Sequence, residues 1–297
     1  MKELHTQRMY LRLFDVDMPP GVQQPIPIAP IQLMDKVDTG VQGIPVVFIT
    51  QRVLTRMQDK DLQPLAERTC KLVAEMCAAS NINTNELQID CDWTAAMKER
   101  YFALLRAIKQ QPFMKGKTLS CTIRMHQVKY TTSSGIPPVD KGMLMCYSMG
   151  DMKKTGERNS ILDVNEAKDY LKHIDNYPLP LDIALPVYQW CILFRGGQFR
   201  GILHDVYPAM VSNSKLFTAV GQNIYRCRAD TLWQGTVLMR NDELRTEQPG
   251  ASDLQDIAAY TTARLQQPAL NVVLFSCDSV TLAKYSLHEL ETVYNIY

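Results

Sequence analysis

Short apolar segments alternate with longer segments of helical periodicity along most of the chain. Strands that are separated by helices predict βαβ units and a parallel sheet. The predicted strands are Tyr10–Val16, Val46–Gln51, Leu87–Trp93, Thr118–Met125, Met143–Tyr147, Leu181–Trp190 and Asn271–Cys277. The predicted helices, in which apolar residues recur every three or four positions, are Leu62–Ala79, Thr94–Lys109, Asn165–His173, Asp253–Leu265 and Ser286–Tyr294.

Several of these strands have one polar face. In Leu87–Trp93, Gln88, Asp90 and Asp92 share one face, whereas Trp93 falls on the apolar face. An open sheet covered by helices on both sides has no place for such a polar face, but a barrel has a polar interior near its mouth. No glycine-rich phosphate turn follows the first strand, which argues against a doubly wound sheet. We therefore predict a TIM-like (β/α) barrel that forms a single domain over residues 1–297.

Seven predicted strands are one fewer than a complete barrel has. The chain opens almost directly on a strand, so we predict a barrel that is N-terminally shortened to seven strands. Its first strand then has an open edge, which a loop or another chain must cover. Residues 19–30 are rich in proline, are expected to lack regular structure, and are a candidate for that loop.

Residues 195–250 break the alternation and are predicted to be an insertion within the barrel. Within it, residues 222–248 are predicted to form a β-hairpin around Trp233-Gln234-Gly235. Just before the insertion, Pro186 is expected to mark the end of its strand or a bulge.

Composition narrows the class of protein. The 297 residues are 46% hydrophobic and 21% charged with a formal charge of +1, as in a soluble globular protein, so we expect neither a nucleic-acid partner nor a membrane span. The eight cysteines include no pair at metal-ligand spacing, and we predict no metal and no cofactor. The first residues lack the apolar run of a signal peptide, which indicates a cytoplasmic protein.

The candidate catalytic residues are Asp90 and Asp92, because active sites of (β/α) barrels lie at the C-terminal ends of the strands. Carboxylates at i and i+2 point the same way, roughly 6.5–7 Å apart. Repulsion and burial would raise the pKa of one of them, which suits an acid/base pair. Alternatively, an arginine such as Arg124 or Arg12 pins both as anions in a structural ion-pair network.

Further polar and aromatic residues at the strand ends are candidates for substrate binding. His126 could be a general acid/base or only a capping donor. The aromatic residues could stack on sugar rings or fill the core. The predicted binding residues are Arg124, His126, Tyr147, Tyr188, Trp190 and Trp93.

The segments LQIDCDWT, YFALL, LSCTIRMHQ, VDKGMLMCYSMGD and YPLPLDIALPVYQW resemble a family of uncharacterised bacterial barrel proteins that are often exported or lipid-anchored. The resemblance covers the chain from about Tyr10 to Tyr294 and implies a barrel with no established activity. In that family a further strand and helix usually precede the segment RLFDVDM. The resemblance therefore agrees with a shortened barrel. It also implies export or lipid anchoring, whereas the first residues of the chain indicate a cytoplasmic protein.

A more distant similarity links the chain to the chitinase-like glycoside hydrolases, whose fourth strand carries the motif D-x-x-D-x-D-x-E. It places Asp90 and Asp92 at the last two aspartates, Leu87 at the first, and Thr94 at the catalytic glutamate. On the sixth strand, Ser148 stands where that family has the aspartate of Met-x-Tyr-Asp. The proton donor of that mechanism is absent, because a threonine hydroxyl is not a general acid near neutral pH.

Three functions stay open from the sequence. The first is a hydrolase acting on a glycan, with Asp92 as acid/base and Asp90 tuning it. The second is a non-catalytic carbohydrate-binding barrel that has lost its acid, which Thr94 favours. The third is a scaffold that binds a protein partner through the insertion.

Overall fold

The structure is a computed structural model that describes residues 4–34, 40–148, 150–203, 205–265, 267, 270–276 and 278–297. The chain divides into two compact units, and each is described by itself. Unit 1 comprises Met1–Leu144 and His173–Asp182, and unit 2 comprises Met145–Lys172 and Ile183–Tyr297.

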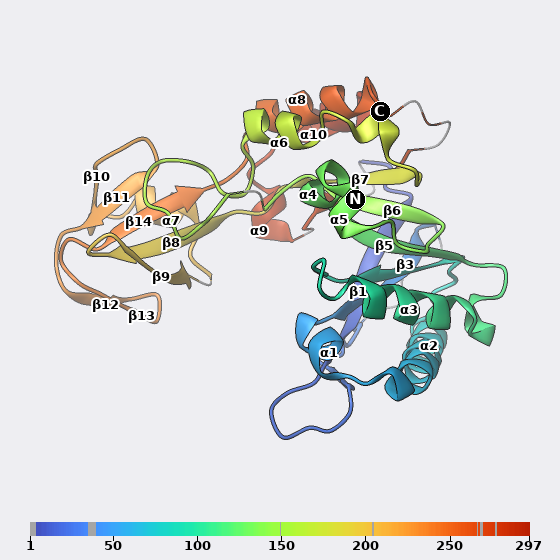
Figure 1. Cartoon of the computed structure of the whole chain (residues 1–297). Coiled ribbons are helices and arrows are strands. Elements are labelled where there is room, and N and C mark those ends of the chain that lie inside the picture. The colour runs from blue at the N-terminus through green and yellow to red at the C-terminus, as the bar shows by residue number, and fades with distance from the viewer. Residues whose placement is uncertain are drawn as a thin grey trace. The chain divides into compact units, whose positions relative to one another are not determined.

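The seven strands that the sequence predicts are all present and belong to one sheet (Figure 1). They are β1 (Arg8–Asp17), β3 (Gln42–Ile49), β4 (Glu86–Asp90), β5 (Thr118–Arg124), β6 (Lys141–Met145), β7 (Leu181–Pro186) and β15 (Val272–Phe275). The strand order is β15-β7-β6-β5-β4-β3-β1-β2, and β1–β3, β3–β4, β4–β5 and β7–β15 pair in parallel. Strand β7 ends at Pro186, as predicted. Cys277, the end of the predicted last strand, lies outside the described residues.

The proline-rich segment corrects one prediction and confirms another. Residues 19–30 were expected to lack regular structure, but Ile26–Ile28 form strand β2, which pairs antiparallel with β1. Such a short strand tolerates proline because it lies at the end of the sheet order, where a ladder donor can be missing. The segment therefore covers the edge of β1, as the sequence suggested.

The two long helices of unit 1 are α2 (Leu62–Ala79) and α3 (Lys98–Lys109). In α2, apolar residues at helical spacing are buried, Leu65 and Val73 among them, and each such side chain contributes about 1.5–3 kcal/mol. The helix ends where Asn81 adopts a positive φ of 55° and the N–H of Ile82 donates to the carbonyl of Cys77 at 2.9 Å. The other helices of unit 1 are α1 (Gln51–Arg56), η1 (Asp59–Asp61), η2 (Pro112–Met114), α4 (Met125–Lys129), α5 (Thr131–Ser134) and η3 (Ile174–Asn176).

Unit 2 contains the remaining helices, three of which lie at segments where the sequence predicts them. These three are α6 (Val164–Tyr170), α8 (Ala251–Thr262) and α10 (Leu287–Asn295), and the others are α7 (Pro208–Ser212) and α9 (Ser279–Leu282). Across the described parts of both units, no helix combines the length and the apolar character that crossing a bilayer requires.

Most of the predicted insertion at 195–250 belongs to a second sheet, which begins earlier, at Trp190. Five antiparallel strands, in the order β10-β11-β14-β8-β9, form this sheet, and β12 and β13 form a separate hairpin (Figure 1). Their bounds are β8 (Trp190–Arg195), β9 (Gln198–Leu203), β10 (Phe217–Ala219), β11 (Ile224–Cys227), β12 (Thr231–Trp233), β13 (Thr236–Leu238) and β14 (Glu243–Glu247). The turn of the hairpin predicted at 222–248 lies between β12 and β13, and the segments that flank this hairpin pair with each other as β11 and β14. Gln234 and Gly235, both with positive φ, form the tight turn of β12–β13.

The strand predicted at Leu181–Trp190 is therefore too long. Because Pro186 ends β7, Trp190 belongs to the antiparallel sheet, where it begins β8 and pairs with Glu247 of β14. The five-stranded sheet has a core of its own, in which Leu193, Phe217 and Leu244 are buried.

Strands β4, β6 and β7 contribute a buried chain of charges to unit 1. The ammonium of Lys141 lies 2.9 Å from Glu86 Oε2 and 2.6 Å from Asp182 Oδ2, and both carboxylates are almost fully buried. The hydroxyl of Ser120 donates to Glu86 Oε1 at 2.6 Å. Since each carboxylate has lost its water, Lys141 balances the charge of both, and Arg8, 3.7 Å from Glu86 Oε2, adds to it at Glu86.

Replacing the lysine should therefore cost far more than a surface lysine does. We expect Lys141→Met to lower the free energy of unfolding by about 3–5 kcal/mol, because it removes the cation that contacts both buried carboxylates. Urea denaturation checks this, with Lys60→Met, at an exposed position of unit 1, as the control. Equal stabilities of the two variants would contradict a balancing role for Lys141.

Candidate functional site

The predicted carboxylates lie together at the end of β4. The hydroxyl of Thr122 donates to Asp90 Oδ1 at 2.7 Å, and the Nε of Arg124 lies 2.6 Å from Asp92 Oδ1. Thr122 and Arg124 are both on β5, which pairs in parallel with β4. The structure thus brings Asp90, Asp92 and Arg124 into one group in unit 1, in which Arg124 pairs with Asp92, while Arg12 pairs with Asp15.

The two carboxylates differ in their surroundings. The pKa of Asp90 is raised above its usual value, chiefly because burial disfavours the charged form and then because Asp92 lies nearby. The hydrogen bond from Thr122 and the charges of Arg12 and Arg124 oppose this shift. Asp92 is half-exposed and forms an ion pair with Arg124. The group therefore combines a carboxyl whose pKa is raised with a neighbouring carboxylate that is paired with a cation.

Two other predicted residues of unit 1, His126 and Trp93, differ in their exposure to solvent. His126 is exposed on α4, and its pKa is lowered by partial desolvation and then by the charge of Arg124. Trp93 is only 2% exposed, stacks on Tyr101 with ring centroids 5.0 Å apart, and donates from Nε1 to the carbonyl of Ser134 at 3.3 Å. Trp93 therefore belongs to the core, on the apolar face that the alternation assigns to it.

In unit 2, the three remaining predicted residues form an aromatic cluster with Phe275. The rings of Tyr147 and Phe275 are stacked with centroids 5.4 Å apart and planes 6° apart. Tyr188 meets both rings edge-on at 5.8 Å and lies 5.3 Å from Trp190. Phe275 was not predicted, although it lies near the end of the strand predicted at 271–277, and a ring near a strand end is the signal that pointed to the other three residues.

Polar contacts hold the aromatic cluster in place. The hydroxyls of Tyr188 and Ser148 are 3.0 Å apart, and the indole of Trp190 donates to Glu247 Oε2 at 2.8 Å. Glu247 is buried and also accepts hydrogen bonds from Ser160 and Arg245. Phe275 remains 46% exposed, so the cluster presents an apolar ring to solvent from a rigid base.

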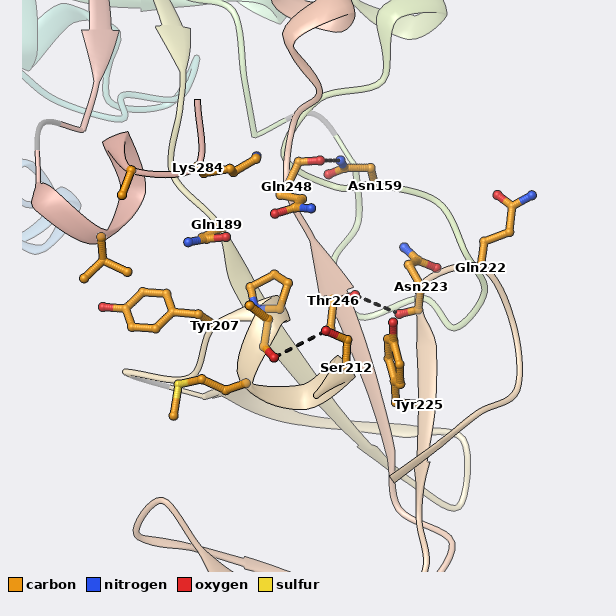
Figure 2. A pocket seen from close by; sticks show the side chains of 15 residues that line it. Asn159, Gln189, Tyr207, Ser212, Gln222, Asn223, Tyr225, Thr246, Gln248 and Lys284 are labelled. Atoms are coloured by element: carbon orange, nitrogen blue, oxygen red, sulfur yellow. Dashed lines mark hydrogen bonds between the residues drawn. The ribbon is translucent and has the colours of Figure 1, made fainter. Parts of the chain in front are cut away.

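Unit 2 also contains a polar pocket of about 710 Å³, which lies within the usual size range of ligand sites (Figure 2). Its walls come from the second sheet, from α7 and from the segments around residues 159, 248 and 284. Ten of the lining residues are labelled in Figure 2: Asn159, Gln189, Tyr207, Ser212, Gln222, Asn223, Tyr225, Thr246, Gln248 and Lys284. None of them was predicted, because they are far apart in sequence and no local motif marks any of them as a binding residue.

The described residues include no group of three or more His, Cys, Asp or Glu side chains that could hold a metal ion. The seven cysteines described are all buried and free. Burial raises their pKa where a shift is found, to about 11 for Cys77 and about 12 for Cys70, so these thiols stay protonated near neutral pH.

Solved structures identify the fold. No family model and no curated protein matches the chain in sequence. The chitinase of Chromobacterium violaceum matches with a TM-score of 0.57 and 9% identity over 99% of this chain and 94% of the chitinase. The spore cortex-lytic enzyme of Bacillus cereus matches at 0.56 and 13% over 99% and 68%, and the Group IV chitinase of Ostrinia furnacalis at 0.53 and 10% over 86% and 80%. The chain thus has the fold of chitinase-like glycoside hydrolases, which confirms the predicted (β/α)-barrel class.

The raised pKa of Asp90 predicts how stability depends on pH. A carboxyl whose pKa is higher in the folded state binds more protons there, so its contribution to stability falls as the pH rises through the unfolded and then the folded value. Asparagine keeps an acceptor oxygen for Thr122 and does not ionise. We therefore expect Asp90→Asn to melt at a higher temperature than the wild type at about pH 7, with the difference vanishing below about pH 4.

Thermal unfolding followed by circular dichroism across this pH range measures the effect. Glu67→Gln, which removes an exposed carboxylate of α2, is the matched control and should show no such difference. A lower melting temperature of Asp90→Asn at neutral pH would mean that Asp90 stabilises the fold as an anion.

Proposed function

We propose that the protein binds a carbohydrate through the aromatic cluster of Tyr147, Tyr188, Trp190 and Phe275. The observation that carries the proposal is the cluster's position: Tyr147 follows β6, Tyr188 follows β7, and Phe275 ends β15. Binding sites of (β/α) barrels lie at these C-terminal strand ends. The exposed ring of Phe275 offers the flat apolar surface on which the C–H face of a sugar stacks, while the hydroxyls of Tyr188 and Ser148 can bond to sugar hydroxyls.

The class of ligand rests on the fold. Two of the solved structures with this fold are chitinases and a third is a cortex-lytic enzyme, so a saccharide is the ligand that the fold favours. Aromatic rings flanked by hydroxyl groups suit a sugar better than they suit a charged or purely apolar ligand.

Binding without cleavage is favoured by the carboxylate group of unit 1. The resemblance places Thr94 where the catalytic glutamate belongs, and a threonine hydroxyl does not give up a proton near neutral pH. Asp92, the carboxylate nearest to Thr94 in the sequence, forms an ion pair with Arg124 at 2.6 Å. The chain is accordingly proposed to be a lectin-like member of a hydrolase fold.

Glycan-array binding with the purified protein, followed by isothermal titration calorimetry of each hit, tests the proposal. We expect Phe275→Ala to weaken the best hit roughly tenfold, which corresponds to about 1.4 kcal/mol, by removing the stacking surface. Tyr130→Ala removes an exposed ring of unit 1 and should leave the affinity unchanged. Equal affinities of wild type and Phe275→Ala would mean that the saccharide does not bind at the aromatic cluster.

Glycan hydrolysis is a second candidate, with Asp92 as acid/base and Asp90 tuning it, and the different surroundings of the two neighbouring carboxyl groups are what favours it. Product analysis on every binding hit tests this function. If cleavage occurs through this group, Asp92→Asn abolishes it with nearly unchanged melting temperature, since a half-exposed ion pair contributes only about 0–1 kcal/mol. Cleavage that survives Asp92→Asn excludes this residue from the reaction, and binding without products supports the lectin-like function.

A further inference from the structure

The polar pocket of unit 2 has a distinctive chemistry. Five of its lining side chains are amides, those of Asn159, Gln189, Gln222, Asn223 and Gln248, and none of the 15 described residues that line it is an aspartate or a glutamate. An amide side chain both donates and accepts hydrogen bonds, as a sugar hydroxyl does. Asn159 and Asn223 already donate to the carbonyls of Gln248 and Glu157, so the three glutamines are the main amide partners for a ligand. The phenol rings of Tyr207 and Tyr225, from the start of α7 and from β11, add apolar surface (Figure 2).

Lys284 is the charged residue among those that line the pocket. Its Nζ donates to the carbonyl of Pro249 at 2.6 Å and to the hydroxyl of Tyr285 at 3.0 Å, and it lies 4.5 Å from the centre of the Tyr285 ring. An ammonium has three N–H donors, so two neutral acceptors leave one donor for a ligand. No carboxylate oxygen forms an ion pair with Lys284 in the part of the chain that the structure describes.

Two acidic residues near Lys284 are engaged elsewhere. Asp253 accepts from the N–H of Gly250 at 2.8 Å, and Glu289 accepts from both the N–H and the hydroxyl of Ser286 at 2.8 Å. Each carboxylate thus caps the N-terminus of its helix, α8 or α10. Although both raise the pKa of Lys284, burial outweighs them and lowers it to about 8. The ammonium lacks a full counter-charge, and a ligand anion would supply it.

We propose that this pocket is a second ligand site that binds an anionic saccharide, with the hydroxyls of the sugar on the amide side chains and its negative group on Lys284. The site shares no residue with the aromatic cluster, and its test does not require that the cluster binds anything. The negative group can be a carboxylate, as in a hexuronic acid, or a phosphate, as in a sugar phosphate, and both need the same cation.

Titrations with glucuronic acid, glucose 6-phosphate and glucose test the charge requirement, because the three probes share a sugar ring and differ at one carbon. We expect both anions to bind wild-type protein at least about tenfold more tightly than glucose. Lys284→Met should abolish this preference, whereas Lys215→Met, at an exposed position of the same unit, should retain it. A tighter complex with glucose 6-phosphate than with glucuronic acid identifies phosphate as the natural group, and the reverse identifies carboxylate.

A measurement on the wild type alone tests the proposal even if Lys284→Met does not fold. Because Lys284 must be protonated to pair with an anion, the affinity for glucuronic acid should fall as the pH rises from about 7 to about 9, while the affinity for glucose stays constant. Equal affinities for glucose and both anions, a preference that survives Lys284→Met, or an affinity for glucuronic acid that does not change with pH would overturn the proposal.

Discussion

Charge balance inside the parallel sheet constrains the strands of unit 1 that carry the candidate carboxylates. Lys141 lies between Glu86 and Asp182 where water is nearly absent, and isolated carboxylates in that position would each lose several kcal/mol of hydration. The same face of β4 carries Asp90 four residues beyond Glu86. The candidate carboxylates therefore depend on a strand whose register is held, at its other end, by a buried ion pair.

Much of the parallel sheet could be predicted because its signals are local. Short apolar segments between helical ones predicted all seven strands, and period-two alternation gave Leu87–Trp93 its polar face. Extending that alternation by two residues from Gln88 would have placed Glu86 on the charged face as well. The same rule assigned Trp93 to the apolar face, so its burial follows from the pattern, whereas the prediction of a sugar contact followed only from its place near a strand end.

The second sheet and the polar pocket could not be predicted in the same way. Their contacts join residues far apart in sequence, as in the pairing of Trp190 with Glu247, and no short segment contains that information. Unit 2 consequently presents two surfaces of different character, an exposed aromatic one and a recessed polar one with a lysine. The saccharide binding proposed for these two surfaces does not require a catalytic acid.

The short strand β2 has a consequence for the behaviour of the protein at high concentration. Its middle residue, Pro27, pairs opposite Val16 of β1 and has no N–H group to donate. A strand added by a neighbouring molecule would find one donor missing in a segment only three residues long. Two features of β2, the ring of its proline and its short length, thus oppose intermolecular extension of the sheet at this side. Such extension is the first step of many fibrillar aggregates.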